Sequence, residues 1–268
     1  MTATAVQALK PIPLATLLFR NLARGNGVDY YDGTHCSTCH LHELCLPGGL
    51  IGRDVDRMDE LVYGRKRVKR GQYLYQAGDP FNSLYAVRTG FFKSNLLMED
   101  GRDLVTGFHM MGEIMGMDGI GTGTYASNAT ALDDCEVCAL PYTHLENLSR
   151  NMQSLQPHFH RMLSREIVRS RDVILWLGSM RAEQRLAAFM LNLSQRFTAR
   201  GYSPSEFNLR MTRTEIGSYL GMKHETVSRL FTRFQDDGLV GVRQRRIRIL
   251  DQAGLRKIME QSVPSVQL

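Results

Sequence analysis

The sequence contains no long hydrophobic run and no export signal. The apolar stretch at residues 14–19 is too short to span a bilayer, and no small-residue cleavage site follows it. We therefore expect a cytoplasmic protein without a membrane partner. Hydrophobic residues make up 43% and charged residues 22% of the 268 positions, which is ordinary for a soluble globular protein of about two domains.

Catalytic motifs are also missing from the chain. It has no supported pairing of a nucleophile with a base, no glycine-rich loop that would cradle a phosphate and no His-Glu-x-x-His motif. The eight histidines are scattered, and isolated histidines are more often structural than catalytic. We expect that the protein is not an enzyme.

Cysteine is scarce, but its placement is informative. Cys36, Cys39 and Cys45 lie within ten residues of one another, and Cys135 and Cys138 follow about 90 residues later. Four of these five thiols can form one site. Because the chain has no export signal, clustered thiols predict a metal site rather than disulfides.

The cysteine spacing leaves the identity of the metal open. An iron–sulfur cluster and a structural zinc ion both bind thiolates. In the zinc alternative, His35, His40 or His42 would complete the ligand set.

Positive charge is concentrated in the last third of the chain. Residues 181–268 carry 15 Lys and Arg against 8 Asp and Glu, whereas the first 180 residues carry 18 against 19. A basic module joined to a neutral one predicts a polyanionic partner such as DNA. The alternative is a basic face that is merely solvated.

The first 145 residues of the chain contain three segments that differ in their sequence pattern. Residues 1–30 form a poorly specified leader, and residues 31–50 hold cysteines without helical or strand periodicity, as in a loop organised by metal. Residues 65–145 consist of short apolar runs separated by glycine-rich turns about every ten residues, which predicts an antiparallel sandwich or barrel.

Residues 155–180 show a heptad spacing. This pattern predicts a long helix that pairs with a second copy of itself, although packing against its own domain is the alternative. The predicted dimerisation stripe consists of Leu163, Ile167, Ser170, Ile174 and Leu177.

Residues 213–232 have the features of a helix-turn-helix. Thr212 is placed to cap the first helix with Glu215 in a capping box, and Gly221 supplies a turn that favours a positive φ. The glycine and apolar positions favour this motif over an ordinary helical hairpin. Residues 239–249 alternate like a small hairpin, so the module is predicted to be winged.

The second helix of the motif places polar side chains on its outer face. Arg229 can donate two hydrogen bonds to guanine, Glu225 can accept one from an exocyclic amino group, and Ser228 can touch a thymine edge. The predicted DNA-binding residues are His224, Glu225, Ser228 and Arg229, with Arg213 and Lys223 placed for phosphates.

Several motifs resemble those of a known family. They are Cys-x-x-Cys-x5-Cys at 36–45, Leu-Tyr-Ala-Val-Arg-Thr-Gly at 84–90, Asp-Gly-Ile-Gly-Thr-Gly at 118–123 and Glu-Thr-Val-Ser-Arg at 225–229. From about residue 33 to about residue 250 the chain resembles the fumarate and nitrate reduction regulators (FNR), within the cyclic AMP receptor protein superfamily.

The resemblance implies an α+β fold in four parts. These are an N-terminal leader and cysteine-rich cluster-binding loop at 1–58, an antiparallel β-roll at 59–150, a long dimerisation helix at 151–182 and a C-terminal winged helix-turn-helix at 183–268. It also implies a [4Fe–4S] cluster held by Cys36, Cys39, Cys45 and Cys138, with Cys138 chosen because it precedes the Leu-Pro that ends this strand in the family.

The resemblance further implies an oxygen-responsive regulator of transcription. Such a protein forms a homodimer when oxygen is low, binds palindromic TTGAT-type DNA sites, activates anaerobic genes and represses aerobic ones. The loop implied to contact RNA polymerase consists of Asp118, Gly119, Ile120, Gly121, Thr122 and Gly123.

Three residues depart from the family pattern. Ser170 stands where enteric members carry an acid that opposes pairing, so we expect this dimer to form more readily without a cluster. His224 replaces a small apolar residue, which predicts a change in one base preference. Cys135 is an additional thiol that could replace Cys138 as a ligand.

A cyclic-nucleotide-binding regulator of the same fold is the remaining alternative. Such a site needs an arginine beside a small hydroxyl residue after the Gly-Glu turn, to clamp the cyclic phosphate. The Gly-Glu turn is present at 112–113, but residues 125–130 contain no arginine.

Overall fold

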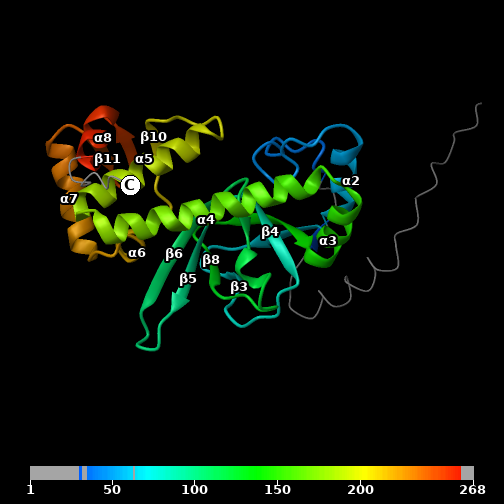
Figure 1. Ribbon diagram of the computed structural model, residues 1–268. Coiled ribbons are helices and arrows are strands. Elements are labelled where there is room, and N and C mark those ends of the chain that lie inside the picture. Colours follow the sequence, from blue (N-terminus) through cyan, green and yellow to red (C-terminus); the bar gives the residue numbers. More distant parts are fainter. Residues whose placement is uncertain (1–29, 32–34, 63, 261–268) are drawn as a thin grey trace, which may run out of the picture.

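The computed structural model describes residues 30–31, 35–62 and 64–260 (Figure 1). One long helix, α4 (Leu155–Ser179), runs through most of the length of the molecule. Residues 35–50, which carry Cys36, Cys39 and Cys45, form the cysteine segment. This segment and the short helices α2 (Arg53–Leu61) and α3 (Tyr142–Asn151) lie near one end of α4. The C-terminal helices lie at the other end, and the β-roll lies along the side of α4.

The β-roll consists, within the described residues, of two antiparallel sheets. The five-stranded sheet has the order β1 (Tyr30–Tyr31), β2 (Gly64–Val68), β9 (Cys135–Pro141), β4 (Ser83–Thr89) and β7 (Ile114–Met115). The four-stranded sheet has the order β3 (Tyr73–Tyr75), β8 (Asn128–Ala131), β5 (Phe91–Leu97) and β6 (Asp103–Met110). These sheets confirm the predicted antiparallel roll.

Strand β9 separates two hydrophobic cores. Its odd-numbered residues, including Cys135 and Val137, pack into the core between the two sheets. Its even-numbered residues Cys138 and Leu140 pack instead against the cysteine segment, α2 and α3. Because successive side chains in a strand point to opposite faces, one strand contributes to both cores.

The C-terminal unit is a winged helix-turn-helix. After α5 (Ala182–Thr198) come β10 (Glu206–Asn208), α6 (Arg213–Leu220), α7 (His224–Asp236), β11 (Val240–Arg243), β12 (Arg246–Ile249) and α8 (Gln252–Glu260). Strands β10, β12 and β11 form a small antiparallel sheet, so the predicted hairpin at 239–249 is present.

The tight turn between α6 and α7 depends on two glycines. Gly221 ends α6 with a φ of 61°, where a side chain would be strained. A Cβ on Gly217 would lie 2.5 Å from the carbonyl oxygen of Met222, so only glycine allows this close approach. The predicted capping box is also formed, since Thr212 Oγ1 accepts from Glu215 N and the Glu215 carboxylate accepts from Thr212 N.

The β-roll and the C-terminal unit share one hydrophobic core. Phe91, Val105 and Phe108 of the roll pack with helix residues such as Phe189 and Tyr219. The Phe108 ring lies 5.0 Å from that of Tyr219 in an edge contact. The helix-turn-helix therefore docks on the roll through the side of β5 and β6.

Candidate metal centre and nucleic-acid interface

Four thiols meet at a small cavity beside α2 and β9. Cys36, Cys39 and Cys45 line it from the N-terminal segment, and Cys138 lines it from β9. The remaining wall is mostly apolar and consists of Leu46, Pro47, Met58, Val62, Ala86 and Leu140, with His42 at one side. None of the five cysteines is in a disulfide. The fold thus brings together the four cysteines that the family resemblance implied.

The cysteine segment has almost no regular secondary structure, so side chains hold it in place. Asp59 on α2 accepts hydrogen bonds from the backbone N–H groups of Cys36 and Ser37, and from Ser37 Oγ at 2.8 Å. His158 on α4 donates from Nε2 to the carbonyl oxygen of Cys45 at 3.3 Å. The segment is therefore attached both to α2 and to the long helix.

The cavity disfavours charge on Cys36, Cys45 and Cys138 when no cation is present. Burial raises the pKa of Cys45 to about 12 and that of Cys138 to about 11. Burial, followed by the neighbouring sulfurs of Cys45 and Cys138, raises the pKa of Cys36 well above its ordinary value. At neutral pH these thiols are protonated, and a bound metal is needed to stabilise them as thiolates.

Two arginines provide positive charge at the edge of this site. Arg88 Nη1 lies 3.7 Å from Cys39 Sγ, and the charges of Arg88 and Arg65 oppose the effect of burial on the pKa of Cys138. Both arginines also pair with Glu136, at 3.1 and 3.4 Å. No local sequence pattern indicates these arginines, because only the pairing of β2, β4 and β9 brings them near the thiols.

Of the three histidines near the cysteines, His40 is exposed and the other two contact carboxylates. His35 Nδ1 lies 3.3 Å from Asp59, and His42 Nε2 lies 2.7 Å from Glu43. Among the residues that the structure describes, no three His, Cys, Asp or Glu side chains converge closely enough to hold one metal ion. The four thiols are related by the one cavity that they all line.

Cys135 lies away from this site. Its sulfur donates to the carbonyl oxygens of Phe91 and Asp133, at 3.2 Å each, inside the core between the sheets. Since it is three positions from Cys138 in the same strand, it points to the opposite face. The suggestion that Cys135 could replace Cys138 as a ligand is therefore wrong for this structure.

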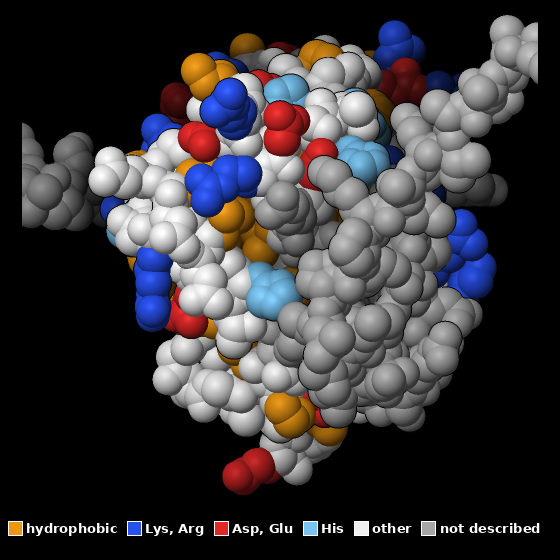
Figure 2. Space-filling model, turned by 90° about the vertical axis from the view of Figure 1, so that its right-hand side faces the viewer, with side chains coloured by type: hydrophobic (Ala, Val, Ile, Leu, Met, Phe, Trp, Pro, Cys, Tyr) orange, Lys and Arg blue, Asp and Glu red, His pale blue; other side chains and the backbone are white. Residues whose placement is uncertain are grey.

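The surface at this end of the molecule carries charges of both signs. Figure 2 shows Lys and Arg, Asp and Glu, and His side chains interspersed among its described residues, with hydrophobic atoms between them. This agrees with the near-neutral charge of the first 180 residues. The basic excess lies at the opposite end.

Helix α4 exposes most of the predicted dimerisation stripe. Ile167 and Ile174 are each 69% exposed, Leu177 is 44% exposed, and Ser170 is also exposed. Leu163 is partly buried and joins the stripe residues Ile167, Ser170 and Ile174 along a groove of about 690 Å³ between the helix and the roll. An exposed apolar stripe of this kind is suited to a partner helix.

Within the described part of the chain, the outer face of α7 is exposed. His224, Glu225, Ser228 and Arg229 are all exposed, while Val227 and the unpredicted Phe231 and Phe234 anchor the helix in the core. Val227, Phe231 and Phe234 follow helical spacing, which turns the polar side of α7 outward.

The two residues predicted to contact phosphates differ in their surroundings. Lys223 is exposed at the start of α7. Arg213 is stacked on the ring of Phe231, with its guanidinium carbon 3.6 Å from the ring centre. Arg213 can therefore contact a phosphate only through the edge of its guanidinium group, because one face of that group is covered by the Phe231 ring.

The predicted polymerase-contact loop lies on the roll. Asp118 accepts a hydrogen bond from Ser127 Oγ at 2.7 Å, and Gly121, Thr122 and Gly123 are exposed. Gly119 and Ile120 face inward. The loop is therefore a surface feature with a buried base.

A β-roll, a long helix with an exposed apolar stripe and a winged helix-turn-helix together define a DNA-binding regulator of transcription. Two family descriptions match the chain, a cyclic nucleotide-binding domain at residues 65–152 and a Crp-like helix-turn-helix domain at residues 184–258.

Relatives at high identity place the chain more narrowly. It is 48% identical over 230 residues to the transcriptional regulatory protein btr of Bordetella pertussis, covering 86% of this chain and 95% of that one. It is 43% identical over 224 residues to the fumarate and nitrate reduction regulatory protein of Escherichia coli K12, covering 84% and 90%. The chain belongs to the fumarate and nitrate reduction regulators of the cyclic AMP receptor protein superfamily, as its motifs predicted.

Solved structures show the same fold. FixK2 from Bradyrhizobium japonicum is 26% identical with a TM-score of 0.66, covering 72% of this chain and 96% of that one. A transcriptional regulator of the CRP/FNR family from Thermus thermophilus, TTHA1359, is 22% identical with a TM-score of 0.58, covering 73% and 98%. No helix in the described part of the chain is long and apolar enough to cross a membrane.

Proposed function

We propose that this protein is an oxygen-responsive global transcription regulator of the cytoplasm. It holds a [4Fe–4S] cluster on Cys36, Cys39, Cys45 and Cys138, dimerises through α4 when oxygen is low, and binds palindromic TTGAT-type sites. In that state it activates anaerobic genes and represses aerobic ones.

The observation that carries the proposal is the convergence of four free thiols on one apolar cavity. Four thiolates are the usual ligand set of a [4Fe–4S] cluster. The four thiols that line this one cavity would supply that ligand set.

The residues around the cavity have distinct roles in this proposal. When bound, the cluster supplies a centre that oxygen can destroy. Asp59 orders the segment that carries Cys36, while Arg65 and Arg88 offset part of the negative charge of four thiolates. The hydrogen bond from His158 to the Cys45 carbonyl connects the segment to α4, where the dimerisation stripe lies.

At the other end of α4, each helix-turn-helix reads one half-site. Arg229, Glu225 and Ser228 contact base edges, Lys223 and Arg213 contact phosphates, and His224 modifies the preference at one position. The loop at 118–123 contacts RNA polymerase from the surface of the roll.

The proposal is tested by replacing each strand cysteine separately under argon. Cys138→Ser should abolish the brown visible absorption of the anaerobically purified protein and its retardation of TTGAT-type palindromic DNA. Cys135→Ser is the matched control on the same strand, and it should leave both properties unchanged. A Cys138→Ser protein that stays equally brown and equally active in DNA binding would contradict the proposed ligand set.

A structural zinc site is the second candidate. His42 lines the same cavity as the four cysteines, so a mixed ligand set is available. A colourless protein after anaerobic purification, with one zinc per chain by elemental analysis, would select this alternative and remove the oxygen response.

A further inference from the structure

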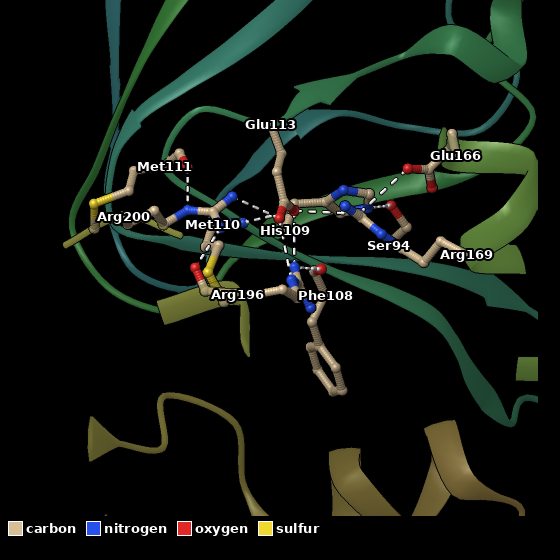
Figure 3. Close-up of polar contacts among 10 residues, drawn as sticks. All are labelled: Ser94, Phe108, His109, Met110, Met111, Glu113, Glu166, Arg169, Arg196 and Arg200. Atoms are coloured by element: carbon tan, nitrogen blue, oxygen red, sulfur yellow. Dashed lines mark hydrogen bonds and ion pairs between the residues drawn. The ribbon is translucent and has the colours of Figure 1, made fainter. Parts of the chain in front are cut away.

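One buried carboxylate is surrounded by three arginines at the junction of the β-roll and the helices (Figure 3). Glu113 pairs with Arg196 at 2.7 Å, with Arg200 at 2.7 Å and with Arg169 at 3.2 Å. The Glu113 side chain is only 9% exposed, and those of Arg196 and Arg200 are 13% and 7% exposed. Little solvent is available to replace the contacts with Arg196 and Arg200, while Arg169 is 26% exposed.

Glu113 and its three arginine partners come from three parts of the fold. Glu113 lies in the turn between β6 and β7, Arg169 lies on α4, and Arg196 and Arg200 lie at the end of α5 and just beyond it. Arg196 also donates to the carbonyl oxygen of Phe108 at 2.6 Å, and Arg200 donates to that of Met111 at 2.6 Å. Thus one carboxylate connects the roll, the dimerisation helix and the first helix of the DNA-binding unit.

A second group of polar contacts joins the β-roll to the DNA-binding unit at α6. Ser218 Oγ on α6 accepts from Val105 N at 2.9 Å and donates to the carbonyl oxygen of Asp103 at 2.9 Å. Lys93 on β5 lies 2.7 Å from Asp103 and 3.3 Å from Glu215 on α6. The two groups of polar contacts add directional constraints to the hydrophobic core that the roll and the DNA-binding unit share.

This docking leaves the DNA-reading surface open. Glu225, Ser228 and Arg229 stay exposed while α6 packs against the roll. The contact therefore does not mask the recognition helix. A dimer that binds two half-sites needs both recognition helices at a fixed separation and orientation, so a rigid attachment favours binding.

We propose that Glu113 is a positioning residue for DNA binding. Through Arg169, Arg196 and Arg200 it holds each DNA-binding unit in the orientation that lets both subunits reach two half-sites at once. Ordering the units before DNA arrives removes an entropic cost from the binding of the second half-site. This inference rests on the proposed reading of a palindrome by a dimer, but not on the identity of the metal.

The test compares a palindromic duplex with a duplex that carries one intact half-site. Glu113→Gln keeps the side-chain size and removes the charge, and Ser218→Ala weakens the second attachment without touching the first. Glu146→Gln, at an exposed position on α3, is the matched control for loss of a carboxylate. We expect both test variants to lose about tenfold in affinity for the palindrome relative to the half-site, a coupling of ordinary size between sites.

The ratio of the affinity for the palindrome to the affinity for the half-site duplex distinguishes a positioning role from a general loss of stability. A variant that is merely unstable loses affinity for both duplexes in parallel, and this outcome would overturn the proposal. An unchanged ratio, a gain in palindrome affinity or a sedimentation shift to monomer would overturn it as well. If thermal melting shows that Glu113→Gln does not fold, Arg169→Gln, which removes one of the three partners of Glu113, replaces it in the comparison. Failure of the unsubstituted protein to prefer the palindrome would instead contradict the proposed function.

Discussion

At the scale of single residues, electrostatics decides the state of Glu113. Burial opposes ionisation, but the charges of Arg196, Arg169 and Arg200 outweigh it and lower the pKa well below the usual range. Three guanidinium groups around one carboxylate leave a net positive charge, which Glu166 reduces through its contact with Arg169 at 3.2 Å. Removal of Glu113 would leave the three arginines close together without their shared partner.

We predict that Glu113→Gln lowers the free energy of unfolding by about 3–5 kcal/mol at neutral pH, the usual effect of breaking a buried ion pair. Because the folded pKa is depressed, the contribution of Glu113 is fully present above the unfolded value near 4.5 and is lost as the pH falls below it. Urea unfolding at a series of pH values should therefore show the gap between the two proteins narrowing in acid. A gap that stays constant down to strong acid would contradict this account.

At the scale of elements, α4 combines three tasks along its length. Near its start His158 contacts the cysteine segment, in its middle Arg169 contacts Glu113, and its exposed stripe is available to a second copy. His158 and Arg169 lie on one side of the helix, and the stripe residues lie on another. A change in the cysteine segment and a change in dimerisation can therefore influence each other through a rigid element.

Ser170 should make the dimer less dependent on its metal. We predict that the protein without metal stays partly dimeric at micromolar concentration, and that Ser170→Asp weakens this dimer by about 1–3 kcal/mol, because two carboxylates would then face each other. Ser170→Asn is the control of matched size without charge, and it should sediment like the unsubstituted chain. A metal-free protein that is fully monomeric before any substitution would reject the prediction.

At the scale of the whole molecule, the two ends have different electrostatic character. The end with the four thiols is nearly neutral, and the winged helix-turn-helix carries the basic excess of the chain. Electrostatic attraction to DNA is therefore confined to the end that reads it. The length of α4 also separates the four-thiol cavity from the DNA-reading helix.

The affinity for DNA should fall steeply with salt, because basic side chains displace counterions from phosphates. We predict that Lys223→Gln lowers affinity similarly for all sequences and reduces the slope of log affinity against log salt by about 1 per subunit. Lys69→Gln, at an exposed position on the roll, should leave the slope unchanged. A change in base preference for Lys223→Gln would show that this residue reads sequence.

Motifs with local physical causes were the most predictable part of the fold. The capping box at Thr212 and Glu215, and the turn at Gly221, depend on residues only a few positions apart, and the structure contains both. The faces of β9 were also predictable in principle, since an odd separation excludes Cys135 from the side of Cys138. By contrast, Phe231 and Phe234 were missed as anchors of α7, although their spacing from Val227 indicated them.

Taken alone, the sequence was sufficient for the helix-turn-helix, for the antiparallel roll and, through its motifs, for the family. Each of these depends on short-range periodicity, capping or turn chemistry. Only the tertiary structure decided that Glu113 meets Arg169, Arg196 and Arg200. It also decided that Arg65 lies near Cys138, and that Arg88 and His158 contact the cysteine segment. Those contacts join residues far apart in the chain, and no local pattern specifies them because they arise from how the sheets and helices pack.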